Sequence, residues 1–300
     1  MNSGGWLSVV IFTLLFSGKL NAQEPQSCQL ARFSILPLTT LPDGRFTVPG
    51  VANEQSFNFL VDTGGAVMTL SNDKAYSLGL LVAKAGGELR GVAGTKSSAI
   101  AFVDNFSLGL MQGKNVPFYI DDRLPSGADG TLSPDIMKHY DVEIDPARGN
   151  INLFSPKHCP GKVVYWTSGG YVALPMSVVS GGHIEIQVMV DGKKVNALLD
   201  TGAVSSIVSL GALRALGITE KSPDLKPVGD KNSSYQLYNY PFKLLDFDGI
   251  TVTNPLIQVA SDNFLPRGTD MLIGVSILRR LHLYIAYGEE KLYITPAMAH

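Results

Sequence analysis

"FLVDTGGAVMTLS" (Phe59–Ser71) and "ALLDTGAVSSIVS" (Ala197–Ser209) spell nearly the same pattern twice in one chain. In each stretch an apolar run leads directly into Asp-Thr-Gly, at Asp62 and at Asp200. A carboxylate at the end of an apolar run is costly to bury unless it is paired or otherwise used. Two such carboxylates in matching contexts predict that they are used together.

The similarity extends well beyond the triplets. Asp200 follows Asp62 by 138 residues, and the same offset aligns several other pairs: Leu36-Pro37 with Leu174-Pro175, Leu78-Gly79 with Leu216-Gly217, Gly91 with Gly229, and Pro117 with Pro255. Further along the offset becomes 141, where Met137 corresponds to Leu278. A repeat that keeps register over this length indicates a duplicated unit and predicts two similar lobes.

Each copy has the pattern of a strand-rich unit. In "HIEIQVMVDGKKVNALLDTG" apolar and polar residues alternate, and Asp191-Gly192 predicts a hairpin turn. Short helices are expected over 72–80 and 210–218, with a glycine near the end of each. Glycine-rich and polar hairpins follow around Gly91 and Gly229. The sequence therefore predicts a mainly β fold.

The N-terminal sequence and the net charge indicate where the protein is located and which classes of partner it has. The apolar run Trp6–Gly18 is too short to span a bilayer and is typical of a signal peptide, with Ala22 as the expected cleavage point. An uncleaved membrane anchor is the alternative. The net charge is −2 and basic residues do not cluster, so no nucleic-acid partner is expected, and a membrane partner only if the N-terminal segment stays uncleaved.

Two cysteines are present, Cys28 and Cys159, and in an oxidising compartment they can pair. Sequence spacing does not show that they meet, so two free thiols remain the alternative. Neither cysteine has the neighbours of a zinc site, and the five histidines have no metal-ligand spacing. No metal and no cofactor are expected.

With its downstream glycine element, this pattern resembles the retropepsin-like and pepsin-like aspartic proteases over about residues 36–296. "LIGVSIL" (Leu272–Leu278) fits the second element of that family's motif well, and "ADGTLSPDIM" (Ala128–Met137) fits it more loosely. The resemblance implies a two-lobed, mainly β fold built from duplicated barrel-like lobes related by a pseudo-twofold axis. The active site would lie between the lobes.

The resemblance also implies a chemistry. Asp62 and Asp200 would share one proton and activate a water that attacks a peptide bond, because two touching carboxyls do not both ionise readily. The triplets would supply supporting residues, with threonines that hydrogen-bond across the lobe boundary and glycines that allow close backbone approach: Thr63, Thr201, Gly64 and Gly202. Gly91 and Gly229 would mark two flaps over a peptide or protein substrate.

Two departures from the family pattern affect the expectations. Gly65 and Ala203 stand where pepsin-like enzymes commonly carry a Ser or Thr that hydrogen-bonds the carboxylate. Without that donor the carboxyl pKa should rise, so we expect a mildly acidic pH optimum. The first hairpin also lacks the usual flap tyrosine, and Tyr235 and Tyr238 near the second hairpin are better explained as strand residues.

Two functions remain open from sequence. One is an active aspartic endopeptidase, and the other is an exported peptide-binding module that has lost turnover. In both, the expected organisation is a signal peptide over 1–22, an N-terminal lobe over 23–156, a connection over 157–171 and a C-terminal lobe over 172–300. Asp129, in an Asp-Gly-Thr sequence, is expected to be a turn residue because no apolar run precedes it.

Overall fold

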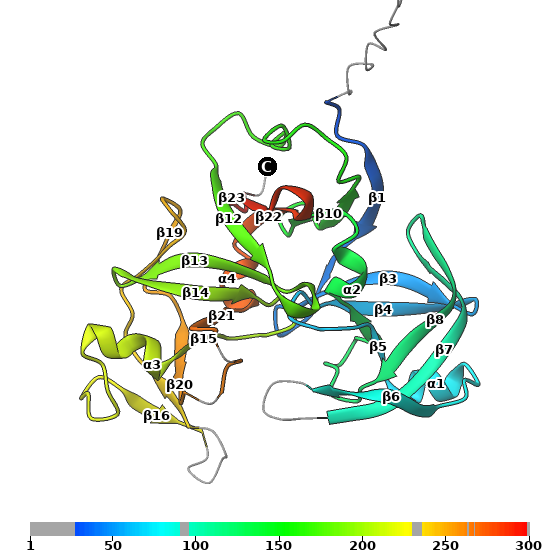
Figure 1. The fold of residues 1–300 in the computed structure, drawn as a ribbon, viewed down its shortest axis with the longest axis horizontal. Coiled ribbons are helices and arrows are strands. Elements are labelled where there is room, and N and C mark those ends of the chain that lie inside the picture. Colours follow the sequence, from blue (N-terminus) through cyan, green and yellow to red (C-terminus); the bar gives the residue numbers. More distant parts are fainter. Residues whose placement is uncertain (1–27, 91–95, 230–235, 263, 267, 299–300) are drawn as a thin grey trace, which may run out of the picture.

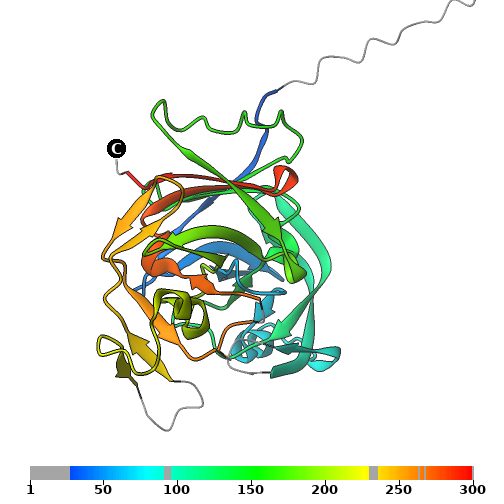
Figure 2. The same cartoon turned by 60° about the vertical axis from the view of Figure 1, so that its left-hand side comes forward.

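The computed structural model describes residues 28–298 except 91–95, 230–235, 263 and 267. The expected signal peptide and Gly91 lie outside the described residues. Two β lobes lie on the two sides of the molecule, and a third group of strands joins them above (Figure 1). The turned view keeps this arrangement, with residues from both ends of the chain in the joining sheet (Figure 2). The predicted two-lobed, mainly β fold is confirmed.

The N-terminal lobe is one twisted sheet whose strands run in the order β2-β3-β4-β9-β5-β8-β7-β6. Its strands are β2 (Thr39–Thr40), β3 (Phe46–Ala52), β4 (Gln55–Val61), β5 (Thr69–Leu70), β6 (Ala83–Arg90), β7 (Lys96–Leu108), β8 (Met111–Ile120) and β9 (Gly130–Leu132). An additional pairing of β3 with β7 folds the sheet back on itself. Side chains of a strand alternate between its two faces, so this closure buries the apolar side chains that point inward.

The C-terminal lobe repeats this plan with shorter strands. Its strands are β13 (Ile184–Val190), β14 (Lys193–Leu199), β15 (Ser206–Ser209), β16 (Lys226–Val228), β17 (Leu237–Asn239), β18 (Leu244–Asp246), β19 (Thr251–Thr253), β20 (Ile257–Ala260) and β21 (Met271–Ile273). The predicted hairpin is present, since Val190 pairs with Lys193 and both Asp191 and Gly192 have positive φ. That geometry is the one Asp-Gly turns adopt between twisted strands.

A sheet shared by both halves joins the lobes. In order its strands are β1 (Arg32–Pro37), β11 (Asn150–Phe154), β10 (Asp141–Asp145), β22 (Leu281–Ala286), β23 (Lys291–Pro296) and β12 (Val172–Val178). The contact between halves is the antiparallel pairing of β10 with β22. The first part of β12 pairs with β23, and its end pairs with β13, so β12 carries the chain from the joining sheet into the C-terminal lobe.

The helices are short, and two helical segments end at a glycine. They are α1 (Asn72–Ser77), α2 (Pro134–Met137), α3 (Leu210–Leu213), α4 (Val275–Leu278) and the 3-10 turns η2 (Ser180–Gly182), η3 (Arg214–Leu216) and η4 (Tyr287–Glu289). Gly79 and Gly217 have φ of 67° and 75° just beyond α1 and η3. Because a side chain is disfavoured in that left-handed conformation, these glycines allow the helical segments to stop where the sequence predicts.

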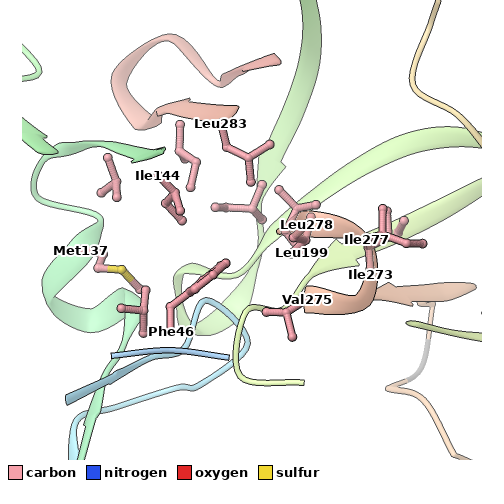
Figure 3. Packing of buried hydrophobic residues seen from close by; sticks show 14 of the residues in the cluster. Phe46, Met137, Ile144, Leu199, Ile273, Val275, Ile277, Leu278 and Leu283 are labelled. Atoms are coloured by element: carbon pink, nitrogen blue, oxygen red, sulfur yellow. The ribbon is translucent and has the colours of Figure 1, made fainter. Parts of the chain in front are cut away.

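One apolar core runs through both lobes and the joining sheet. Figure 3 shows its centre, where Phe46 and Met137 of the N-terminal lobe approach Leu199, Val275 and their neighbours in the C-terminal lobe. These four named side chains are at most 2% exposed. Because burial of a large apolar side chain contributes about 1.5–3 kcal/mol, the shared core makes separation of the lobes costly.

The outer face of the joining sheet carries buried acidic side chains. Three acids alternate along β10, namely Asp141, Glu143 and Asp145, and all are at most 4% exposed. The connection between lobes covers them: His158 contacts Asp141, and Tyr165 donates to Glu143 at 2.7 Å.

Glu143 shows how this buried charge is stabilised. His282 Nε2 lies 2.9 Å from Glu143 Oε1, and Asn152 also donates to the carboxylate. Burial works to raise the pKa of Glu143, but hydrogen bonds from His282, Tyr165 and Asn152 outweigh it and hold that pKa below its ordinary value. The charged side chain is therefore retained under the connection because it is fully hydrogen-bonded.

A disulfide joins Cys28 to Cys159, with 4.9 Å between their α-carbons. It fastens the connection to the segment just before β1 and closes a loop of 131 residues. The possible pairing is thus realised, and the alternative of two free thiols is wrong. Among the described residues, the helices are all too short or too polar to cross a membrane.

Loss of this disulfide should destabilise the fold through the unfolded chain, which gains conformational freedom over the long loop. For the double variant Cys28→Ser, Cys159→Ser we expect the free energy of unfolding, measured by urea denaturation, to fall by about 2–5 kcal/mol. Adding a thiol reductant to the unaltered protein should reproduce the shift. An unchanged urea midpoint in both experiments would contradict this role.

Candidate active site

Both triplets begin where a strand leaves the sheet at the lobe boundary. β4 ends at Val61 and runs parallel to β9, so that the Asp62 amide donates to Leu132 O at 3.0 Å. In the other lobe, β14 runs parallel to β21 and the Asp200 amide donates to Ile273 O at 3.0 Å. Each aspartate is thus anchored by its own sheet at an equivalent position.

The threonines of the triplets bind the two loops to each other. The Thr63 amide donates to Thr201 Oγ1 at 3.0 Å, and the Thr201 amide donates to Thr63 Oγ1 at 3.0 Å. Each hydroxyl then donates to a backbone carbonyl of the opposite lobe, Thr63 to Leu199 O at 2.8 Å and Thr201 to Val61 O at 2.6 Å. Both threonines are 1% exposed. Because a broken partner would leave buried polar groups unpaired, this reciprocal network holds the loops in one arrangement.

The structure brings the carboxyls of Asp62 and Asp200 into hydrogen-bonding contact. Backbone amides orient them, since Gly64 N donates to Asp62 Oδ1 at 3.1 Å and Gly202 N donates to Asp200 Oδ1 at 2.9 Å. The Ala203 amide adds a further bond to Asp200 Oδ1 at 3.0 Å. Both aspartates are partly buried as residues.

The surroundings of Asp62 and Asp200 shift the pKa values of the two acids differently. Burial raises the pKa of Asp62, against the amides of Gly64 and Gly65 and the hydrogen bond from Asp200, which lower it. Burial and then the charge on Asp62 raise the pKa of Asp200 to about 8, and the hydrogen bond to Asp62 acts in the same direction. The pair therefore holds one proton between its two carboxyls, and their hydrogen bond, which lowers the pKa of Asp62 and raises that of Asp200, favours the proton on Asp200.

The glycines of the triplets leave the space that the carboxyls occupy. A Cβ on Gly64 would overlap the carboxyl of Asp200, and a Cβ on Gly202 would overlap the carboxyl of Asp62. Each lobe therefore needs glycine so that the acid of the other lobe can reach the centre.

Gly65 explains why the first-lobe element matches the family pattern loosely. Leu132 and Ile273 occupy equivalent positions, so Ser133 stands where the C-terminal lobe has Gly274. A Cβ on Gly65 would lie 2.7 Å from Ser133 Oγ, which is too close. The N-terminal lobe thus pairs Gly65 with Ser133, and the C-terminal lobe pairs Ala203 with Gly274. In each lobe the residue without a side chain leaves room for its partner.

Asp129 holds a turn, as its sequence context predicts. Its carboxylate accepts from the Asn58 amide at 2.9 Å, and Asp270 accepts from the Asn196 amide at 3.0 Å in the other lobe. Asp270 follows Asp129 by 141 residues, which agrees with the change of offset after the hairpins. Neither carboxylate takes part in the central pair.

The candidate flaps are hairpins at equivalent places in the lobes. β6 pairs with β7, and β16 pairs with β17, in antiparallel fashion. Gly229 is exposed directly after β16, with φ of 82°. Tyr238 pairs with Val259 and Pro227 within the sheet, as expected for a strand residue, and Tyr235 lies outside the described residues.

Two residues, Arg45 and His183, reach the Asp-Thr-Gly loops although the motif itself gives no sign of them. Arg45 Nη1 donates to Gly202 O at 3.1 Å, and His183 Nε2 donates to Gly65 O at 3.0 Å. They occupy equivalent positions under the 138-residue offset, but one copy has arginine and the other histidine. Because the residue types differ, the repeat alone does not reveal them.

Comparison with known families matches each half separately. A family model described as aspartyl protease matches residues 48–136, and a model described as gag-polyprotein putative aspartyl protease matches residues 186–280. Together the two matches cover more than half of the chain and include both Asp-Thr-Gly triplets.

The chain belongs to the retropepsin-like and pepsin-like aspartic protease family.

Solved structures share the fold of this aspartic protease family member. The chain is similar to basic 7S globulin from soybean, with a TM-score of 0.55, 9% sequence identity, and coverage of 91% of this chain and 96% of that chain. It is also similar to an aspartic proteinase from Irpex lacteus, with a TM-score of 0.55, 14% identity, and coverage of 87% and 96%. No curated protein matches the sequence. At these identities the likeness concerns the fold alone.

The close fit at Gly64 leads to a stability prediction. Gly64→Ala should lower the free energy of unfolding by about 1–3 kcal/mol, because the new methyl group must displace the Asp200 carboxyl. Gly170→Ala is the matched control, since a Cβ there meets open space, and it should change stability by less than about 0.5 kcal/mol. Equal effects in the two variants, measured by urea denaturation at pH 5, would contradict the fit.

The raised pKa of Asp200 leads to a second prediction. In the unfolded chain this carboxyl ionises from about pH 4, whereas the folded protein keeps its proton up to about pH 8. The folded state therefore loses stability as pH rises between these values. Asp200→Asn removes that cost, so its melting temperature relative to the unaltered protein should increase from pH 4 to pH 8. Asp104→Asn, at an exposed site, should show no such trend, and a flat difference for Asp200→Asn would refute the assignment.

Proposed function

We propose that this protein is an aspartic endopeptidase that hydrolyses peptide bonds with a water molecule activated between Asp62 and Asp200. The observation that carries the proposal is the hydrogen-bonded pair of carboxyls at the lobe boundary, one from each lobe. A structural carboxylate needs no such partner. Two acids with separated pKa values have the arrangement required for paired general acid and base catalysis.

In the proposed mechanism the two carboxyls have different tasks. Asp62, which holds the charge, takes a proton from the water molecule while the water oxygen attacks the carbonyl carbon of the substrate. Asp200 donates its proton to the carbonyl oxygen, so a neutral tetrahedral diol forms without an acyl-enzyme. Asp62 then passes its proton to the amide nitrogen while Asp200 recovers one from a diol hydroxyl, and the C–N bond breaks. The dyad returns to its starting state with one proton.

The substrate class follows from the family and from the surface near the dyad. A hollow of about 680 Å³ borders the C-terminal catalytic loop at Val204 and Ser205. Its wall includes Leu256 and Tyr240, and its rim carries Lys226 among other polar residues. Such a surface suits a peptide with apolar side chains. The hairpins near Gly91 and Gly229 are proposed as flaps over the substrate.

Export is part of the proposal. The disulfide between Cys28 and Cys159 fits an oxidising compartment, either the periplasm or the extracellular space. We retain residues 1–22 as a signal peptide and assign the mature chain to an N-terminal lobe (23–156), a connection (157–171) and a C-terminal lobe (172–300).

Turnover separates the enzyme from a peptide-binding module with the same cleft. The purified protein is incubated with a mixed peptide library from pH 3 to pH 9, beside Asp62→Asn and the control Asp104→Asn. The proposal predicts cleavage by the protein and by the control, and a loss of at least about 10³-fold in the Asp62 variant, because the base is removed. Peptide binding without cleavage by the unaltered protein would identify the binding module instead.

The dependence of kcat/KM on pH tests the roles of the two acids. Activity should rise as Asp62 ionises, above the ordinary carboxyl value of about 4, and fall as Asp200 loses its proton near pH 8. The expected profile is a bell from the mildly acidic to the neutral range. A maximum below about pH 3 would contradict both the raised pKa values and the absence of a lowering side-chain donor at Gly65 and Ala203.

A further inference from the structure

The same turn precedes the first long strand of each lobe. The last residue of the turn points toward the lobe boundary. In the N-terminal lobe Leu41 N donates to Arg45 O at 2.8 Å, and in the C-terminal lobe Val179 N donates to His183 O at 2.9 Å. A second backbone bond is also repeated, from Gly44 N to Leu41 O and from Gly182 N to Val179 O, both at 2.9 Å.

Glycine in this turn lets each lobe pack on the other. Gly44 and Gly182 have φ of 90° and 86°. A Cβ on Gly44 would lie 3.1 Å from Arg279 of α4, and a Cβ on Gly182 would lie 3.0 Å from Pro134 of α2. Both helices lie at the end of the second motif element of their own lobe. The turns therefore dock in a pseudo-symmetric way, each against the helix of the opposite lobe.

From these docked turns the two basic side chains cross the boundary. Arg45 Nη1 reaches Gly202 O in the loop that carries Asp200, and His183 Nε2 reaches Gly65 O in the loop that carries Asp62. Both side chains come from the lobe that does not own the loop. Each loop thus receives a hydrogen bond from the opposite lobe in addition to the threonine network.

The two cross-lobe contacts differ in electrostatic support. Asp43 accepts from Arg45 Nη2 at 2.6 Å and balances its charge. The position equivalent to Asp43 is Gly181, and a Cβ there would lie 3.3 Å from the His183 ring. The histidine side therefore has no carboxylate at the position where the arginine side has one.

We propose that Arg45 and His183 are positioning residues of the active site, each holding the catalytic loop of the opposite lobe so that the two carboxyls meet. They touch neither the carboxyls nor the proposed substrate, and they act through the carbonyls of Gly202 and Gly65. The requirement is strict because a displacement of about 1 Å at a catalytic centre can cost about 100-fold in rate. The electrostatic interaction with His183 also lowers the pKa of Asp62, which favours the ionised form of that acid.

Hydrogen exchange of the loop amides tests this cross-lobe action directly, without turnover. His183→Ala should speed exchange in residues 64–66 by about 5- to 10-fold and leave residues 202–204 within about twofold, as expected for loss of one hydrogen bond near a charged group. Arg45→Ala should do the reverse. His183→Gln, whose amide can donate to the same carbonyl, should restore protection. The exposed residues His139 and Arg280 provide the controls His139→Ala and Arg280→Ala.

Several outcomes would overturn the proposal. They are faster exchange only in the loop of the altered lobe, equal effects on both loops, no effect on either loop, or a glutamine variant no better protected than the alanine variant. Melting temperatures show which variants are folded, and if an alanine variant does not fold, His183→Gln and Arg45→Lys are compared with the unaltered protein.

The claim that these two residues position the carboxyls for catalysis rests on the proposed function, and enzyme kinetics test it separately. With a cleavable peptide, His183→Ala should lower kcat per titrated active site by about tenfold while KM stays within about twofold, and His183→Gln should recover most of the loss. An equal kcat, or a change in KM alone, would contradict positioning. If the unaltered protein cleaves nothing, the proposed function fails while the exchange experiment still decides whether the two side chains hold the loops.

Discussion

The structure depends on one reciprocal set of hydrogen bonds, in which Thr63 and Thr201 each bond the other's loop at the lobe boundary. These bonds are buried, so neither lobe can withdraw without leaving polar groups unpaired. They hold Gly64 against the carboxyl of Asp200 and Gly202 against the carboxyl of Asp62, so that the two acids meet. The shared core and the joining sheet make this contact permanent within a single chain.

Duplication explains much of this architecture, but the differences between the copies carry the chemistry. A symmetric pair of carboxyls would have no preferred location for its proton. Here the amides of Gly65 and Ala203 lower the pKa of their own acids alike, whereas His183 acts on Asp62. The shared hydrogen bond lowers the pKa of Asp62 and raises that of Asp200. We infer that divergence of the two halves assigned the base to one lobe and the acid to the other.

The sequence predicts those features that depend on local pattern. The register of the repeat, the Asp191-Gly192 hairpin and the glycines that end the short helices follow from periodicity and backbone freedom. Features set by tertiary contact were not predictable. The acids Asp141 and Glu143 alternate with apolar residues like a strand with one solvated face, and they are buried only because the connection folds over them. Arg45 and His183 have no common residue type, and only the folded lobes show that both cross the boundary.

Carbon-13 NMR titration of the aspartate carboxyls tests the central claim, that Asp62 and Asp200 share one proton, most directly. Asp62→Asn and Asp200→Asn assign the two resonances. The account predicts coupled titration in which Asp200 retains its proton to about pH 8, and a lower Asp200 pKa once the charge at position 62 is removed. Two carboxyls that titrate independently near pH 4, unaffected by each other's substitution, would contradict it.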